Sequence, residues 1–514
     1  MPDVIPTRPS APELTPLRTV IGWARADLSD NPGSRDADLV DSTVIAGLSL
    51  SSQRVVAGDL YAAAPGARVH GAQFVDDAVG SGAVAVLTDA EGAAQCAHLG
   101  VPVLVVARPR PILGSLAARV YGEPAKELRL VAVTGTQGKT TTTRLAESGL
   151  LAAGFPAAVI GTVGTRINGV EVKSSLTTPE APDLHALFAV MREQEVVGCA
   201  MEISSHALVM GRVDGVVFDV AVFTNLGRDH LDFHSDVEEY YLAKASLFTP
   251  ERSGLGLVNI DDEYGRRLVD EATVPVRTFS ATNPDADWSA SEVEMTPTGS
   301  TFNVKSPGGV TFPAAVGLTG DFNVANALCA IAAMGEVGFD PRKVADGIAV
   351  AGGVPGRLEQ VDAGQDFVAI VDYAHKPDAV TAALEALRPL AEGRLIVVIG
   401  AGGDRDHGKR PIMGEIAARL ADVLIVTDDN PRTEDPAAIR AAVLDGAASV
   451  PEPERADVHE VGDRRTAIRH AVTMAVAGDI LLVAGKGHET GQEVRGTVHP
   501  FDDRDVVREE VAAR

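Results

Sequence analysis

The stretch 131–143 constrains the fold of this chain more than any other part of the sequence. An apolar run, Leu128–Val133, leads into the turn Gly135-Thr-Gln-Gly138, and Lys139-Thr140 then opens a predicted helix. In such a strand–turn–helix unit, backbone N–H groups of the turn and the positive end of the helix point at phosphate oxygens. Lys139 can reach the outer phosphates of a nucleotide, and the Thr140 hydroxyl can bind Mg²⁺. The sequence therefore predicts a phosphate-binding α/β domain.

The turn departs from the common nucleotide-binding pattern at one position. Val133 stands where the first Gly of G-x-x-x-x-G-K-[ST] is expected, so only the shorter run from Gly135 to Thr140 matches. The alternative is an ordinary turn with a surface Lys, although Gly, Gly, Lys and Thr fall at the required offsets after a strand. The candidate nucleotide contacts in this segment are Gly135, Thr136, Gln137, Gly138, Lys139, Thr140 and Thr141.

Length and composition limit the class of protein. A chain of 514 residues is too long for one hydrophobic core and suggests about three domains. The hydrophobic fraction of 45%, with only 4% aromatic residues, fits α/β layers better than a β-sandwich. The formal net charge of −26 argues against nucleic acid or an anionic membrane as a partner. A phosphate-bearing substrate would then need locally placed Lys and Arg.

The sequence indicates a cytoplasmic location. Cys96, Cys199 and Cys329 are scattered and odd in number, which fits a reducing compartment without a disulfide framework. No run approaches the roughly 20 apolar residues that a membrane-spanning helix needs, so we expect no membrane insertion. Residues 1–18 are rich in proline and have no apolar core segment, which predicts a disordered leader.

Strand and helix signals alternate in three regions, which are separated by breaks at 121–127 and 352–356. The first region has predicted strands at Val44–Leu50, Ala83–Leu87 and Val101–Val106, with a helix-like stretch at Ala72–Ser81. The second has predicted strands at Leu128–Val133, Ala157–Ile160, Gly198–Ile203, Val217–Thr224 and Gly256–Asn259. The third has them at Phe367–Asp372, Arg394–Ile399, Val423–Thr427 and Ile480–Ala484. The later two regions are typical of doubly wound sheets, whose sites lie at the carboxyl ends of the strands.

Two polar clusters follow strands of the second region. Glu202 ends a strand beside the phosphate turn, where a carboxylate is a natural Mg²⁺ ligand, although it could also cap the next helix. Asp229, His230, Asp232 and His234 crowd together after the next strand. Since His can be a metal ligand or an acid–base group, the cluster favours a functional role over a structural one.

Two further basic residues of this region have functional and ordinary interpretations. Lys244 lies on an amphipathic helix, where a surface position or an ion pair is the default. Arg212 can pair with a phosphate or carboxylate through two hydrogen bonds, or it can be a solvated residue at a helix end.

The third region carries three dense polar runs, each directly after a predicted strand: 400–410, 428–432 and 485–489. The first lacks the third Gly of G-x-G-x-x-G because Arg405 replaces it, which argues against NAD. Opposite charges gathered at one sheet edge suit a zwitterionic ligand such as an amino acid. The candidates are Arg405, Asp429, Asn430, Arg432 and Glu489.

Taken in order, these motifs resemble the Mur ligases, the ATP-dependent enzymes that add amino acids to bacterial cell-wall precursors. The resemblance covers nearly the whole chain after about residue 46. The matching runs are Thr134–Thr141, Thr177–Pro179, Met201–His206, Thr224–Asp232, Leu318–Asn326, Gly356–Glu359 and Asp372–His375. Within the family, Asp429-Asn-Pro-Arg432 and Gly485–Glu489 resemble the MurE type, which adds meso-diaminopimelate.

The resemblance implies an α/β fold of three domains: a small N-terminal α/β domain, a central P-loop doubly wound ATPase domain and a C-terminal Rossmann-like domain. After the leader, 1–18, the boundaries are 19–125 for the end that binds the UDP substrate, 126–353 for ATP and 354–514 for the amino acid. The family reaction uses ATP to phosphorylate the γ-carboxylate of D-glutamate in UDP-N-acetylmuramoyl-L-alanyl-D-glutamate. The amine of diaminopimelate then attacks the acyl phosphate. The implied cofactors are ATP and Mg²⁺, the implied partners are small molecules, and the oligomeric state stays open.

The resemblance also implies roles for single residues. Lys139 and Thr140 hold phosphates, with Thr140, Glu202 and His230 near metal, and Lys244 matches the carbamylated lysine of the family, whose negative charge could support a second Mg²⁺. Positions near the nucleotide are Asn323, Asn326, Arg357, Asp372 and His375. Positions that hold the muramoyl dipeptide are Thr177, Thr178, Ser204 and Arg212. Positions of the diaminopimelate pocket are Arg405, Asp429, Asn430, Arg432, Gly485 and Glu489.

One run departs from the family. An Asp-Ser-Arg run is typical ahead of the Gly-Asp-Leu turn, but Ser51-Ser-Gln53 stands here before Gly58-Asp-Leu60. The acid and the Arg are missing, so Ser52 is the only residue that this run assigns to the uridine end.

Other functions remain as alternatives. A sister ligase could add L-lysine or extend folate with glutamate, against which Arg432 and Glu489 argue. A P-loop switch or motor would normally carry an Asp-ended strand or an Asn-Lys-x-Asp run, and neither is found. A binding module that has lost activity is disfavoured by Lys139, Glu202 and Lys244.

Overall fold

The computed structural model describes residues 5–66, 68–172, 176–227, 229–230 and 233–514. The chain forms two compact units. The first comprises Met1–Ser289 and Cys329–Gly347, and the second comprises Ala290–Leu328 and Ile348–Arg514. Within the described part of the chain, every helix is too short or too polar to cross a membrane.

The first unit begins with a five-stranded sheet of order β2-β7-β6-β5-β4, in which β4 to β7 are parallel and β2 is antiparallel. Its strands are β2 (Asp27–Leu28), β4 (Gly47–Ser49), β5 (Asp59–Ala63), β6 (Ala85–Thr88) and β7 (Val103–Val105). A separate two-stranded pair joins β1 (Thr15–Pro16) to β3 (Val44–Ile45). The helices are α1 (Leu17–Ala24), α2 (Pro32–Arg35), α3 (Ala37–Ser42), α4 (Val75–Gly80), α5 (Ala90–Gln95) and α6 (Leu113–Val120). Short 3₁₀ turns are η1 (Ser52–Arg54), η2 (Gly71–Phe74), η3 (Arg110–Ile112) and η4 (Pro124–Glu127).

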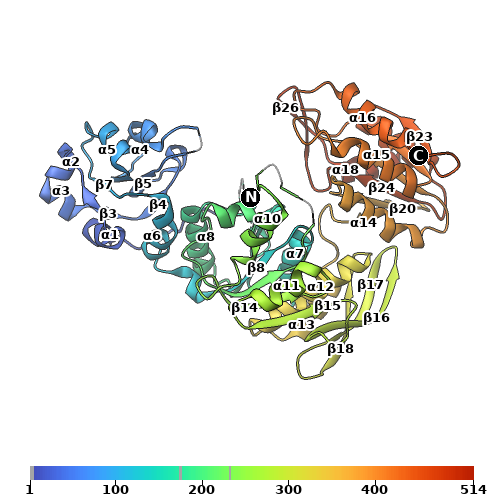
Figure 1. Ribbon diagram of the computed structural model, residues 1–514, viewed down its shortest axis with the longest axis horizontal. Coiled ribbons are helices and arrows are strands. Elements are labelled where there is room, and N and C mark those ends of the chain that lie inside the picture. The colour runs from blue at the N-terminus through green and yellow to red at the C-terminus, as the bar shows by residue number, and fades with distance from the viewer. Residues whose placement is uncertain (1–4, 67, 173–175, 228, 231–232) are drawn as a thin grey trace. The chain divides into compact units, whose positions relative to one another are not determined.

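Both faces of this sheet are covered, as the alternation along β5 requires. Leu60 and Ala62 join the apolar cluster that α1 and α6 complete, whereas Tyr61 and Ala63 join the cluster under η2 and α4. Successive side chains of a strand point to opposite faces, so a strand buried on both sides is apolar throughout. Figure 1 shows α4 and α5 on one side of the sheet and α1 and α6 on the other.

The prediction of a disordered leader at 1–18 is wrong for residues 5–18. Arg8 lies 3.3 Å from the Asp59 carboxylate and donates to the Tyr121 hydroxyl, and the N–H groups of Ser10 and Ala11 donate to Glu193. Proline favours an extended chain without internal hydrogen bonds, so the composition resembles that of a disordered segment. The distant partners that hold the segment leave no local pattern in the sequence.

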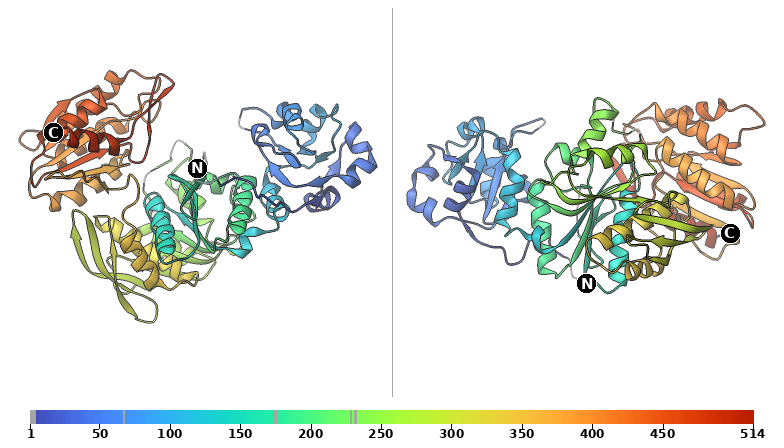
Figure 2. Two further views of the ribbon diagram at one scale, coloured as in Figure 1. Left: turned by 180° about the vertical axis from the view of Figure 1, so that it is seen from behind. Right: turned by 60° about the horizontal axis from the view of Figure 1, so that its bottom comes forward.

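The central sheet continues the first unit with order β11-β10-β9-β12-β8-β13-β14-β15-β16. Seven neighbouring strands pair in parallel, in the order β9, β12, β8, β13, β14, β15 and β16, and β10 and β11 add an antiparallel hairpin. The strands are β8 (Arg129–Thr134), β9 (Ala157–Gly161), β10 (Gly164–Ile167), β11 (Val170–Val172), β12 (Gly198–Glu202), β13 (Phe218–Phe223), β14 (Ser253–Asn259), β15 (Val276–Ser280) and β16 (Trp288–Thr296). The helices are α7 (Lys139–Ala152), α8 (Ala181–Glu193), α9 (Ser205–Val209), α10 (Val237–Ala245), α11 (Glu263–Glu271), α12 (Asp321–Glu336) and α13 (Pro341–Val350). Figures 1 and 2 show helices on both sides of these strands.

The second unit contains the remainder of β16, the antiparallel pair β17 (Gly299–Lys305) and β18 (Thr311–Val316), and a six-stranded sheet of order β19-β20-β24-β21-β22-β23. All of that sheet is parallel except the edge strand β19. Its strands are β19 (Glu359–Gln360), β20 (Val368–Asp372), β21 (Leu395–Ile399), β22 (Val423–Val426), β23 (Asp457–Glu460) and β24 (Ile480–Ala484), followed by the hairpin β25 (Gly491–Val494) and β26 (Thr497–Pro500). Its helices are α14 (Pro377–Leu387), α15 (Lys409–Leu420), α16 (Pro436–Ala448), α17 (Arg464–Met474) and α18 (Asp503–Ala512), with a short turn η5 (Arg388–Leu390).

Alternate residues of this sheet again face two separate cores. Val397 and Leu482 pack with α14, α15 and α16, whereas Val398 and Val483 pack with α17 and α18. The prediction of α/β domains with doubly wound sheets is confirmed, and each predicted strand overlaps an observed one. The predicted strand Val44–Leu50 is two short strands, β3 and β4, and the predicted helix at Ala72–Ser81 begins as the turn η2.

Candidate active site

The phosphate turn has the predicted strand–turn–helix form. Strand β8 ends at Thr134, and α7 begins at Lys139 after Gly138, whose φ of +84° favours glycine. Gly135 has φ +150°, and a Cβ there would collide with the Thr224 hydroxyl. The backbone conformation of the turn that leads into α7 therefore requires both glycines.

Side chains from the end of β13 and from α10 fix this turn. Thr224 donates its hydroxyl to the Gln137 carbonyl (2.7 Å), and Asn225 accepts the Gln137 N–H (2.9 Å). The Thr136 and Tyr240 hydroxyls lie 3.1 Å apart. Lys139 folds over the turn, with Nζ donating to the carbonyls of Gly135 (2.8 Å) and Thr136 (2.9 Å). These contacts hold the turn in a defined conformation at the start of α7, where the helix terminus favours an anion.

Lys244 is buried against the phosphate turn, so the surface interpretation is wrong. The residue is 1% exposed, its Nζ donates to the Gly135 carbonyl (2.8 Å), and the ammonium lies 4.5 Å from the centre of the Tyr240 ring. Helix α10 therefore directs a buried cation at the first residue of the turn.

Glu202 ends β12 as a buried carboxylate and does not cap a helix. One oxygen accepts the Thr162 N–H (2.8 Å) and the other accepts the Thr162 hydroxyl (2.9 Å). The N-cap of α9 is Ser204, whose hydroxyl accepts the Ala207 N–H. Thr178 donates to the Glu202 carbonyl (2.8 Å), which joins the predicted dipeptide residues to the strand end.

Three histidines gather beside Tyr240. The ring centres of His206 and His230 are 4.9 Å apart, and those of His234 and Tyr240 are 5.2 Å apart. His230 has φ +55°, and its Nε2 lies 3.3 Å from an Asp229 oxygen. Asp232, from the predicted cluster, lies outside the described residues. In the described part of the chain, no three His, Cys, Asp or Glu side chains converge as a metal site, so metal binding by Glu202 and His230 stays a prediction.

Arg212 is paired, so the solvated interpretation is wrong. Its Nε lies 2.9 Å from one oxygen of Glu180, and Arg110 lies 3.1 Å from the other. Thr177 lies within 3.2 Å of the Thr162 hydroxyl. The predicted dipeptide residues thus surround the end of β12. Glu180 is an acidic neighbour that no sequence motif indicated.

A cavity of about 960 Å³ opens beside the first sheet. Ser51, Ser52 and Gln53 line it, as do Arg54 and Arg110. Arg54 directly follows the run in which the family Arg is missing, and it lies 3.0 Å from Asp183. Arg54 was not predicted as a site residue, because it stands one position after the place where the family has its Arg.

In the second unit, the residues predicted to lie near the nucleotide fall into two groups. On α12, the Asn326 amide nitrogen donates a hydrogen bond to the Asn323 amide oxygen (3.1 Å). Asp372 ends β20, where burial raises its pKa and N–H groups of Leu358 and Ala374 donate to it at 2.7 Å each. Burial lowers the pKa of His375 to about 4, so this ring is neutral at pH 7.

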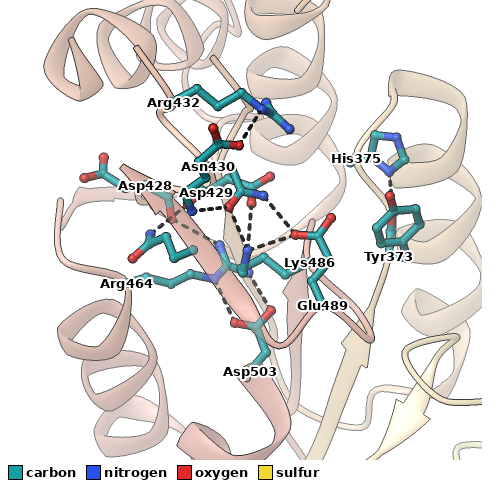
Figure 3. A network of polar contacts seen from close by, with 12 residues as sticks. Tyr373, His375, Asp428, Asp429, Asn430, Arg432, Arg464, Lys486, Glu489 and Asp503 are labelled. Atoms are coloured by element: carbon teal, nitrogen blue, oxygen red, sulfur yellow. Dashed lines mark hydrogen bonds and ion pairs between the residues drawn. The ribbon is translucent and has the colours of Figure 1, made fainter. Parts of the chain in front are cut away.

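The polar runs after β22 and β24 meet in a single network (Figure 3). Asn430 donates its amide to Glu489 (2.8 Å), and the buried Lys486 donates to both Asn430 (3.1 Å) and Glu489 (2.9 Å). Asp429 lies 3.7 Å from the Lys486 ammonium. Behind it, Arg464 forms two 2.7 Å hydrogen bonds with Asp503. Lys486, Arg464 and Asp503 were not predicted as site residues. Of these three, only Lys486 lies within a recognised motif, Gly485–Glu489.

Arg432 and the hairpin β25–β26 close one side of this network. Arg432 has φ +53°, donates to the Gly403 carbonyl (2.7 Å) and lies 3.3 Å from the Glu493 carboxylate. The Glu493 N–H donates to Asn430 (2.9 Å), and Gln492 donates to the Asp429 carbonyl (2.7 Å). Arg405 is exposed and donates to its neighbour Asp404. The structure therefore gathers Asp429, Asn430, Arg432 and Glu489, and it gives no contact of Arg405 with them.

The chain belongs to the Mur ligase family. Residues 44–121 match the description "Mur ligase family, catalytic domain", residues 133–334 "Mur ligase middle domain" and residues 356–487 "Mur ligase, glutamate ligase domain". The three-domain α/β architecture is that of the family.

Named relatives cover nearly the whole chain. The UDP-N-acetylmuramoyl-L-alanyl-D-glutamate–2,6-diaminopimelate ligase of Streptomyces coelicolor is 55% identical over 98% of each chain. The ligase of the same name from Corynebacterium glutamicum is 49% identical over 92% of this chain and 93% of its own. A solved structure with that title superposes with a TM-score of 0.67 at 34% identity, covering 92% of this chain and 96% of the other.

Proposed function

We propose that this chain is an ATP-dependent ligase of the MurE type, which joins meso-diaminopimelate to UDP-N-acetylmuramoyl-L-alanyl-D-glutamate in peptidoglycan precursor synthesis. The observation that carries the proposal is the full-length 55% identity to a ligase of that name, in a chain where Asp429, Asn430, Arg432 and Glu489 adjoin one another. A cytoplasmic location stays a prediction.

ATP is assigned to the phosphate turn and Lys139, with Asn323, Asn326, Arg357, Asp372 and His375 as further nucleotide contacts. Gly135 and Gly138 support this assignment, because their positive φ values shape the turn that leads into the N-terminus of α7, where an anion is favoured. His375 would contact the nucleotide as a neutral ring.

Mg²⁺ fits the donors near the turn. The Thr140 hydroxyl, the Glu202 carboxylate and the His230 imidazole are oxygen and nitrogen ligands suited to a divalent cation. When bound, Mg²⁺ would offset the repulsion between the γ-phosphate and the substrate carboxylate. Thr162 orients the Glu202 carboxylate through its two hydrogen bonds. We propose that Lys244 carries a carbamate, which forms when its neutral amine adds to CO₂ and releases a proton.

The chemistry is two successive transfers. The γ-carboxylate of D-glutamate attacks the terminal phosphorus of ATP, which forms an acyl phosphate and releases ADP. The free amine of diaminopimelate then attacks the acyl carbon, and the tetrahedral intermediate expels inorganic phosphate as the amide forms. Lys139 would stabilise the transferred phosphoryl group, since a Lys ammonium stabilises the negative charge that builds on phosphate oxygens.

The UDP substrate is assigned to the first unit. Thr177, Thr178, Ser204 and Arg212 would hold the muramoyl dipeptide near Glu202. Ser52 lies in the 960 Å³ cavity, and Arg54 and Arg110 of the same cavity could supply the cations that the Ser51–Gln53 run lacks for the diphosphate. The chain segments 19–125, 126–353 and 354–514 keep their assignment to UDP substrate, ATP and amino acid.

Diaminopimelate is assigned to the network at the carboxyl ends of β22 and β24, formed by Asp429, Asn430, Arg432, Lys486 and Glu489, which we call the amino-acid pocket. Arg432 would bind the distal carboxylate that lysine lacks, and Asp429 and Glu489 would accept the distal ammonium. Gly485 leaves room beside Asp429, and Arg405 is a second candidate for a carboxylate. Leaving the partly buried Arg432 unpaired would disfavour lysine, although the nearby Glu493 carboxylate would reduce that cost.

The test is phosphate release with ATP, Mg²⁺ and UDP-N-acetylmuramoyl-L-alanyl-D-glutamate, with meso-diaminopimelate or L-lysine offered in parallel. Release with diaminopimelate alone is expected. Release with lysine instead would leave a sister ligase and reject the assignment of Arg432. Release without any amino acid or UDP substrate would indicate an NTPase that is not a ligase.

A further inference from the structure

We propose that Lys486 is a positioning residue that prepares the amino-acid pocket for its substrate. Its buried ammonium fixes the orientation of the Asn430 amide and balances the charges of Asp429 and Glu489. The proposal rests on the function proposed above and adds a residue on which the affinity for the amino acid depends.

Lys486 connects loops that follow strands which are not neighbours. It lies directly after β24, whereas Asp429 and Asn430 follow β22, and β21 separates these two strands in the sheet. Its side chain is 0% exposed, and its Nζ donates to Asn430 Oδ1 (3.1 Å) and Glu489 Oε2 (2.9 Å). The contacts in Figure 3 therefore join the loops after β22 and β24, and one ammonium group contacts a side chain in each loop.

The contacts determine which way the Asn430 amide points. Its Oδ1 accepts from two donors, Lys486 Nζ and the Glu493 N–H, while its Nδ2 donates to Glu489 (2.8 Å). Rotating the amide by 180° would set its N–H groups against an ammonium and an N–H, so all three hydrogen bonds would be lost. An amide nitrogen carries two hydrogens, and the second can be donated to a substrate carboxylate.

The same ammonium sets the charge of the pocket. Asp429 is 6% exposed, and its Oδ1 is a buried oxygen that accepts no hydrogen bond from the described residues. Two carboxylates in a buried site repel each other, and burying them costs free energy unless cations are near. Arg464 is already committed to Asp503 through two bonds. Among these three groups, Lys486 leaves one net negative charge on Asp429 and Glu489, which matches one substrate ammonium.

The experiment compares Michaelis constants for the three substrates in the full-length Lys486→Met variant. We expect the KM for diaminopimelate to rise about 30-fold or more, because one partner of a buried charge pair is removed. The KM values for ATP and the UDP substrate should stay within about twofold, and Lys486→Arg should recover part of the loss by restoring the charge. Equal rises for all three substrates, or no rise for diaminopimelate, would overturn the proposal.

A matched control separates positioning from folding. Arg394 binds the buried carboxylate of Asp479 (2.7 Å) at the amino ends of β21 and β24 in the same sheet. Arg394→Met should lower the melting temperature and leave the KM for diaminopimelate unchanged.

A double variant covers the case in which Lys486→Met does not fold. In Lys486→Met/Glu489→Gln the net charge of the pocket is restored, so we expect a folded protein whose KM rises by less than the product of the single effects. Failure of both variants to fold would assign Lys486 to stability alone and overturn the proposal. A wrong assignment of the proposed function gives a different result, because the unmodified protein would then release phosphate with another amino acid.

Discussion

The phosphate turn and the amino-acid pocket both lie at the carboxyl ends of parallel strands, but they are made of different parts of the chain. The turn uses the backbone of one short segment, Gly135–Lys139, and a few side chains hold it in place. The pocket uses side chains from loops about β22 and β24, with a hairpin behind them. Backbone donors recognise any phosphate, whereas placed side chains recognise one amino acid. We therefore expect changes in the turn to abolish turnover and changes in the pocket to alter selectivity.

The largest effect is expected from Gly135→Ala. The added Cβ meets the Thr224 hydroxyl at a backbone position with φ +150°, so the turn must shift. Phosphate release should fall by about 100-fold or more with every amino acid, as when oriented donors are lost. Gly154→Ala is the matched control, because Gly154 also has positive φ but has open space around it. Comparable losses in both variants would show that backbone strain, and not the shape of the turn, is responsible.

Arg432→Met should act on selectivity. Without the guanidinium, the distal carboxylate of diaminopimelate loses a charge-assisted contact, so kcat/KM for diaminopimelate should drop by about 10- to 100-fold. The value for L-lysine should change little, and the preference between the two should narrow. A uniform loss for both amino acids would place Arg432 in the scaffold of the loop.

A third prediction concerns how the free energy of unfolding depends on pH, and it compares the two units. Burial lowers the pKa of His185 in the first unit and of His375 in the second to about 4 from an ordinary 6.5. A histidine with a lowered pKa in the folded state takes up a proton more readily when unfolded. Stability should therefore fall as pH drops from about 6.5 toward 4, by about 1.4 kcal/mol per pH unit for each residue.

Urea unfolding at pH 7 and pH 5 measures this slope. His185→Gln should flatten it, and His499→Gln, at an exposed position, should leave it unchanged. An unaltered slope in His185→Gln would mean that other groups control the acid response.

The smallest effect is expected from Glu493→Gln. The Glu493 carboxylate lies 3.3 Å from Arg432 and is partly exposed, so the pair contributes little to stability. Removing the charge should free Arg432 for the substrate and lower the KM for diaminopimelate by about two- to fivefold. A higher KM would show that Glu493 holds Arg432 in its binding position.

The same comparison explains what the sequence could and could not predict. Residues 131–143 specify the turn locally, so strand, glycines and helix were all predictable. The runs after β22 and β24 were recognised, but their contact through Lys486 depends on a strand order that no local pattern encodes. Strand β5 was missed because Asp59–Ala63 directly follows Gly58 and reads as the end of a turn. Arg8 was missed because its partners, Asp59 and Tyr121, are far along the chain.

The hairpin β25–β26 gives the acceptor pocket a separate route to evolve. Its residues supply a main-chain donor to Asn430 and a side-chain donor to the Asp429 carbonyl, while its second strand is exposed, with Val498 at 66%. Substitutions or length changes there would move Asn430 and Arg432 while every motif residue stays the same. Related enzymes with an identical signature could thus differ in acceptor choice, and resistance to a compound aimed at this pocket could arise in the hairpin without altering the residues that the compound touches.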